Sequence, residues 1–198
     1  MSKSRQPQRT RSALINHGLK LMAARGIHAC RVEDITSAAG VAKGSFFVHF
    51  TSKEAFVAAL VESILTELAR RVRPLGMHPV QPQELLEATA AVHLRFFQLR
   101  PESASLLIQI LAADPQSPPI AQALRHLNAY VDMLAQMLGP ASSVLGWEGR
   151  HGQELALAIL AMSAGVFAMA QRLGALKNTP PELLDTLGRA LARGMGRP

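Results

Sequence analysis

Apolar residues recur at three- and four-residue spacings along most of this chain, and no stretch alternates convincingly in the pattern of a half-buried strand. Aromatic residues, which favour strands, make up only 5% of the sequence. The clearest helical example follows Ser52, where one wide apolar stripe consists of Phe56, Val57, Leu60, Val61, Ile64, Leu65, Leu68 and Val72. Because this period fits a helix and not a strand, the sequence predicts an all-α fold.

We expect about nine helices. They span about residues 10–25, 32–39, 43–50, 53–73, 83–99, 101–113, 119–138, 153–173 and 181–193. Proline stands at or near the start of three of them, and glycine follows two of the ends, at Gly139 and Gly174. Pro74 is expected to end the fourth helix, since proline has no backbone N–H to continue the hydrogen-bond ladder.

Residues 32–53, VEDITSAAGVAKGSFFVHFTSK, form the most informative stretch. They read as two short helices around a turn, where Gly40 can adopt the left-handed conformation that ends the first helix. The second helix carries Lys43, Ser45 and His49 outward. Since the major groove of DNA admits one helix while a preceding helix braces it across the backbone, this pattern predicts a helix-turn-helix.

The positive charge of the chain is concentrated near its amino end. Residues 1–51 hold eight Lys or Arg and two acidic residues, whereas residues 52–198 hold thirteen basic and twelve acidic residues. A basic segment suits a polyanion, although a solvated tail would also account for the four charges in the first eleven residues. We therefore expect a DNA-binding helix-turn-helix domain at 1–51 and a helical regulatory and dimerisation domain at 52–198.

The sequence favours a cytoplasmic protein. Cys30 is the only cysteine, so no internal disulfide is expected and a reducing compartment is favoured. The amino end lacks the apolar run of a signal peptide. The longest uncharged apolar run, residues 155–170, is shorter than the roughly 20 residues that span a bilayer, so no membrane association is expected.

Gly26, Ile35, Ala39-Gly40-Val41, Lys43-Gly44, His49-Phe50 and Ser52-Lys53-Glu54 together resemble the amino-terminal domain of TetR-family transcriptional regulators. The resemblance covers residues 10–60 well and the rest only by length and helix count. It implies a bacterial protein with a three-helix DNA-binding head and a six-helix body. It also implies a homodimer formed by the last two long helices, which binds a palindromic operator, usually represses, and releases DNA when a small molecule enters the body.

The candidate DNA-binding residues come from the residue chemistry and from this resemblance. They are Arg31, Lys43, Gly44, Ser45, Phe47, Val48, His49 and Lys53. Three departures from the family pattern leave the operator sequence open. Ala42 cannot cap the second helix of the motif, Phe47 and Val48 replace a frequent Tyr pair, and Arg31 stands near a position where a hydroxyl residue is common. His49 and Lys53 also have simpler interpretations, as a packing residue and a solvated helix-start residue.

Two further sets are candidates in the body. The resemblance implies an effector pocket, for which the candidates are Met77, His93, Phe96, Phe97, Leu107, Ile110, Leu111, Met133 and Met137. These residues also fit plain core packing, and His93 fits a surface position. A small apolar effector is expected because aliphatic side chains and methionine predominate.

The candidate dimer interface combines small residues, which allow close helix approach, with apolar ones. It consists of Leu157, Ala158, Ala161, Met162, Gly165, Val166, Met169, Leu184, Leu187 and Leu191. The alternative for this set is a core within one chain. A dimer would let two heads engage half-sites roughly 34–36 Å apart.

No glycine-rich phosphate loop, nucleophile elbow or metal-ligand spacing of histidines is present, so we expect no catalytic residue, no metal and no cofactor. The sequence thus favours a ligand-responsive, homodimeric, DNA-binding transcriptional regulator, most simply a repressor of a palindromic operator. The alternative is a dimeric, helical protein that binds a small molecule and has lost sequence-specific DNA binding.

Overall fold

The computed structural model describes residues 5–77, 81–142 and 152–174. Its elements are α1 (Arg5–Arg25), α2 (Val32–Ala38), α3 (Lys43–His49), α4 (Lys53–Val72), the 3₁₀ helix η1 (Arg73–Met77), α5 (Pro82–Leu99), α6 (Pro101–Leu111), α7 (Pro118–Ser142) and α8 (Gly152–Arg172). No strand occurs in these three ranges, and the all-α prediction is confirmed. The ninth expected helix, at 181–193, lies outside them.

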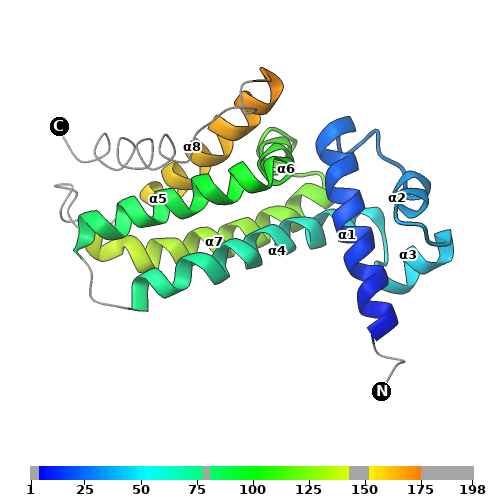
Figure 1. Ribbon diagram of the computed structural model, residues 1–198, viewed down its shortest axis with the longest axis horizontal. Helices are drawn as coiled ribbons and strands as arrows, with labels where there is room; N and C mark the ends of the chain where they lie inside the picture. Colours follow the sequence, from blue (N-terminus) through cyan, green and yellow to red (C-terminus); the bar gives the residue numbers. More distant parts are fainter. Residues whose placement is uncertain (1–4, 78–80, 143–151, 175–198) are drawn as a thin grey trace.

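The helices form two groups along the long axis of the molecule (Figure 1). We call α1, α2 and α3 the head, and α4 to α8 the body. The long α4 leaves the head and packs along α7, and α7 also packs against α8. The body meets the head again through α6, which packs against α1.

Aromatic rings form the centre of the head. The Phe46 ring of α3 lies 5.2 Å from that of Phe56 on α4, and the Phe50 ring lies 4.8 Å from Phe56. All three side chains are buried. Pairs of this kind each contribute roughly 0.5–1.5 kcal/mol beyond their buried area, so α3 is held firmly on the start of α4.

Gly18 explains how closely α1 crosses α4. A Cβ atom at this position would lie 2.3 Å from Cζ of Phe56, well inside van der Waals contact. Glycine in a helix costs roughly 0.5–1 kcal/mol relative to alanine. Here it allows the buried Phe56 ring to lie directly against the α1 backbone.

Two expected helix ends were wrong, the start of α1 and the end of α7. Helix α1 begins at Arg5 and not near residue 10. The sequence did not predict this start because the first turns are polar and give no apolar period. Helix α4 ends at Val72, beside Pro74 as expected, and the chain continues as η1, since the φ angle of Pro74 fits a 3₁₀ turn. Helix α7 continues to Ser142 and includes Gly139 and Pro140 in its final turn.

Helix α8 also departs from the expectation that no segment could span a membrane. In the described ranges, its residues 152–169 are long and apolar enough for a span by length and composition alone. The same helix packs against α5, α6 and α7. A core helix passes this test equally well, so the finding gives little support for a membrane span.

Candidate nucleic-acid interface

A tight glycine turn joins α2 to α3. Gly40 has a φ angle of +67°, in the left-handed region, as the sequence predicts. Its N–H donates to the carbonyl of Ser37 at 3.1 Å, and the N–H of Val41 donates to that of Thr36 at 3.0 Å. These bonds occupy carbonyls that the end of α2 leaves free, and they fix the direction in which α3 leaves the turn.

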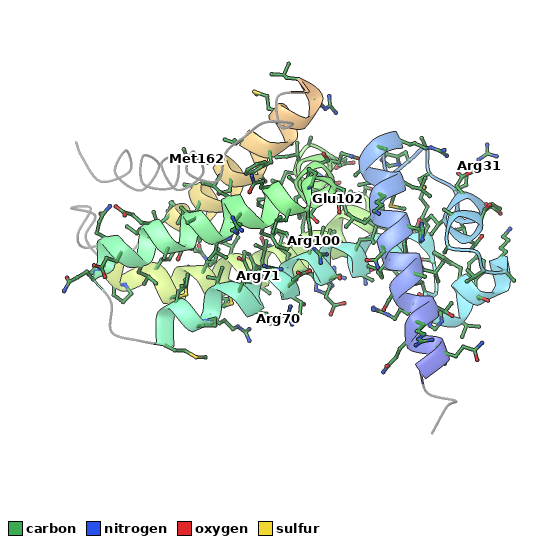
Figure 2. The ribbon with its side chains drawn as sticks, in the orientation of Figure 1. Arg31, Arg70, Arg71, Arg100, Glu102 and Met162 are labelled. Carbon is green, nitrogen blue, oxygen red and sulfur yellow. The ribbon has the colours of Figure 1, made fainter. Side chains whose placement is uncertain are left out.

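Both short helices begin without a side-chain cap. Arg31 precedes α2, and its guanidinium has no acceptor atom to offer. Its backbone N–H donates instead to Oδ2 of Asp34 at 2.9 Å. The Arg31 side chain is therefore not used in capping and projects from the outer end of the head (Figure 2). Ala42 precedes α3 and makes no cap either.

Helix α3 has one buried and one exposed face. Phe46 is fully buried, whereas Phe47 is 51% exposed and Val48 is 80% exposed. Lys43 and Gly44 are exposed, and Ser45 and His49 are half-buried beside them. Two large apolar side chains that face solvent on a rigidly held helix are available for a partner surface.

Lys43 is paired with Glu33 of α2. The Nζ–Oε1 ion pair joins two side chains that are both more than half exposed. The hydrogen bond from Lys43 lowers the pKa of Glu33, so the carboxylate is ionised at neutral pH. Glu33 thus neutralises the charge of Lys43, which the sequence predicts to contact DNA. The ion pair is weak enough for Lys43 to exchange Glu33 for a phosphate.

Lys53 lies at the junction of the head and α4. Its Nζ donates to the carbonyl of His28 at 3.2 Å, which ties the loop before α2 to the start of α4. Next to it, Ser52 Oγ accepts from the N–H of Ala55 at 3.1 Å, and this is the cap that the sequence predicts. Lys53 is half-buried, so part of its charge remains accessible.

The first turns of α1 join this surface, and the sequence reasoning missed them. Gln6, Pro7 and Thr10 line a shallow pocket of about 240 Å³ together with Ser45, Val48 and His49 of α3. The available signal was the charge of Arg5 and Arg9, which the expected helix start at residue 10 left outside the helix. We call the predicted DNA-binding residues together with Gln6, Pro7 and Thr10 the reading face.

The candidate pocket residues of the body are dispersed. Phe96, Phe97, Leu107 and Ile110 are buried in the core, Met133 and Met137 are partly buried against it, and Met77 and Leu111 are exposed. Met133 lines a groove of about 200 Å³ with Tyr130, His126 and Arg73, without any other member of the set.

His93 is fully buried, so the expectation of a surface position was wrong. Its Nδ1–H donates to the carbonyl of Thr89 at 2.8 Å, which leaves Nε2 to accept from the Tyr130 hydroxyl at 2.8 Å. Burial lowers the pKa of His93 to about 4 and raises that of Tyr130. The pair is thus neutral at physiological pH and joins α5 to α7 inside the body.

The described part of the candidate dimer set lies along α8. Leu157, Ala161, Met162, Val166 and Met169 are exposed, and Met169 reaches 66%. Ala158 and Gly165 are half-buried between them. Met162 is on the outer side of the helix (Figure 2). Leu184, Leu187 and Leu191 lie outside the described residues.

Known proteins resemble the head most strongly. The family described as "Bacterial regulatory proteins, tetR family" matches residues 14–60. The transcriptional repressor DhaR of Mycobacterium sp. (strain GP1) is 40% identical over 62 residues, 31% of each chain. The transcriptional regulator TcmR of Streptomyces glaucescens is 32% identical over 127 residues, 55% of each chain. The chain thus spans between a third and about half of the length of these relatives.

Solved structures share the whole fold. The fatty acid degradation regulator FadR from Bacillus halodurans superposes with a TM-score of 0.76 and 17% identity, over 92% of this chain and 98% of that one. FadR from Bacillus subtilis, solved in complex with stearoyl-CoA, gives a TM-score of 0.76 and 16% identity, over 93% of this chain and 97% of that one. At these identities the likeness shows the fold alone.

Proposed function

By its amino-terminal domain this chain belongs to the TetR family of bacterial regulatory proteins, and from that premise we propose that it is a ligand-responsive, DNA-binding transcriptional regulator, most simply a repressor. One observation carries the proposal. Helix α3 presents Lys43, Phe47 and Val48 to solvent, while the buried Phe46 fixes the helix in an aromatic core. A helix held in this way can enter a major groove without reordering the head.

We divide the chain functionally near residue 51. The head supplies the reading face, and the residues from 52 onward supply dimerisation and regulation. The exposed apolar stripe on α8 supports a homodimer, because it is too apolar for a surface that remains in water. Two heads related by a two-fold axis would bind a palindromic operator.

The proposed effector is a small apolar or amphipathic molecule. Three buried hydroxyl groups of the body support an effector that carries a polar group. They have no hydrogen-bond partner among the described residues, and they are Thr89 Oγ1, Ser103 Oγ and Ser163 Oγ. Buried hydroxyls are normally satisfied, so these groups are available to a bound polar group. The stearoyl-CoA complex of Bacillus subtilis FadR gives the related fold a precedent for an acyl ligand. A thermal-shift screen of acyl compounds tests this, with a rise in Tm expected on binding.

The relatives reported above are all named as regulators. This supports a non-catalytic role for the chain and a cytoplasmic location, where a DNA-binding protein meets its operator. The sequence offers no catalytic motif that would favour another role.

The proposal is tested by removing charges from the reading face. Lys43→Ala and Lys53→Ala are each expected to weaken binding to duplex DNA and to lower the slope of log K against log salt concentration by roughly 1. Arg125→Ala, which removes an exposed charge from α7, is the matched control and should leave both quantities unchanged. If both lysine variants bind like the wild-type chain, the reading face is misplaced.

The second candidate function is a dimeric small-molecule-binding protein that no longer reads DNA specifically. The uncapped Ala42 and the apolar Phe47 and Val48 favour it, since they replace groups that could bond to phosphate. Selection from random duplexes separates the two functions. One enriched inverted repeat supports the regulator, and the absence of enrichment supports the alternative.

A further inference from the structure

The side chain of Gln109, on α6, makes three hydrogen bonds to the carboxyl end of α1. Its Oε1 accepts from the N–H of Ile27 at 3.2 Å. Its Nε2 donates to the carbonyl of Met22 at 3.2 Å and to that of Ala23 at 3.3 Å. Each bond joins residues more than eighty positions apart, so the side-chain amide of one body residue binds the carboxyl end of a head helix.

The bonding pattern permits only one orientation of this amide. The reverse orientation would place the oxygen against two carbonyls and the amide nitrogen against an N–H. The end of a helix leaves its last carbonyls without partners in the ladder, and Ile27 is a buried residue. The carbonyl of Met22 also accepts from the N–H of Gly26 at 2.9 Å, so Gln109 chiefly supplies, from another element, partners for the Ala23 carbonyl and the Ile27 N–H.

Packing near this contact is open. The described residues leave a groove of about 750 Å³ between α1, α6 and α8, and several of its walls are small, at Ala23, Ala24, Gly165 and Ala168. Across this groove α1 and α8 are not closely packed, so the angle of α1 depends on its contacts with α6 and α4. The close contact of Gly18 with Phe56 fixes α1 at its middle, and Gln109 fixes its carboxyl end.

From these contacts we propose that Gln109 is a positioning residue for DNA recognition. It sets the angle of the head on the body, and hence the distance between the two heads of a dimer. Helix α6 packs against α8, which carries the proposed dimer face, so Gln109 links each head to that face through one further helix. This inference rests on the proposed function. Its readout is the spacing between half-sites, which a residue that only stabilises the fold would not change.

The experiment compares full-length chains on duplexes that carry the selected half-sites and differ only in the number of base pairs between them. Wild type is expected to prefer one spacing. Gln109→Met keeps the length of the side chain and removes all three hydrogen bonds. Its preference for that spacing over the neighbouring ones should fall about tenfold, the equivalent of one or two net hydrogen bonds. Its affinity for a single half-site should not change.

Gln122→Met is the matched control. Gln122 is a half-buried glutamine of α7 whose side chain makes no hydrogen bond to the described residues, and its substitution should leave the spacing preference unchanged. Gln109→Glu is the second variant in case Gln109→Met does not fold. It keeps the acceptor for Ile27 but sets a carboxylate against two carbonyls, so it should broaden the preference as well.

The outcomes separate the inference from the proposed function. If wild type prefers one spacing and the folded Gln109 variants keep that preference, the positioning role is wrong and the proposed function stands. If wild type binds no inverted repeat, the proposed function fails and the positioning role fails with it. Faster hydrogen exchange at the Ile27 amide confirms in Gln109→Met that the contact was lost.

Discussion

At the scale of single residues, the reading face combines charge with exposed apolar area. The side chains of Phe47 and Val48 cannot donate a hydrogen bond to phosphate. They nevertheless lie on the most exposed part of α3. Apolar side chains on such a helix can contact thymine methyl groups in the major groove. Lys43 and Arg31 supply the charge at its edge. This division of roles suggests that the residues departing from the family pattern change which bases are read.

Glu33 restrains Lys43 in the free protein, and Glu33→Gln should release it. An exposed pair of this kind is weak, so DNA affinity should rise only a few-fold, and more at low salt. The measurement is a fluorescence titration of labelled duplex. Glu84→Gln removes an equal charge from the exposed face of α5 and serves as the control. Equal gains from both variants would mean that net charge alone, not the release of Lys43, changes the affinity.

Two glycines of the head should respond oppositely to alanine. Gly18→Ala forces a Cβ against the buried Phe56 ring and should lower the free energy of unfolding by about 1–3 kcal/mol. Gly44→Ala meets nothing within 4 Å and should raise it by up to about 1 kcal/mol. Urea unfolding measures both. Gly44→Ala should also weaken DNA binding if the α3 backbone approaches the duplex, and unchanged binding would place Gly44 away from it.

At the scale of elements, the sequence predicts best what is decided locally. The left-handed Gly40, the Ser52 cap and the α8 stripe follow from residue chemistry within a turn or two. The start of α1 was missed because polar turns carry no period, and the end of α7 was missed because Gly139 and Pro140 do not end that helix. The partner of Gly18 and the depth of His93 are set by helices distant in sequence, which no local pattern encodes.

The His93–Tyr130 pair between α5 and α7 makes stability depend on pH. Burial holds the pKa of His93 at about 4, below its usual 6.5, so the unfolded chain binds the proton more readily. Stability should therefore be complete above pH 6.5 and fall towards pH 4, by up to about 1.4 kcal/mol per pH unit. Urea unfolding across this range measures it. His93→Gln should show a shallower fall, and an equal fall in both proteins would show that His93 is not responsible.

At the scale of the whole molecule, the head and body share a continuous apolar core in which α1 packs against α6 and α4, and three specific contacts add to it. Lys53 ties the loop before α2 to α4, Gly18 lies against Phe56, and Gln109 holds the end of α1. A protein joined in this way can pass a change in the body to the head through the packing of α1 and through these contacts. The sequence indicates the two groups of helices through their charge, but it does not encode where they touch.

Hydroxyl-radical footprinting of the full-length chain on its selected duplex tests the central claim most directly. Two copies of the head on one side of the double helix should protect two patches of backbone, related by two-fold symmetry and about one helical turn apart. Lys43→Ala should weaken both patches equally. A single protected patch, or protection spread evenly along the duplex, would contradict the account.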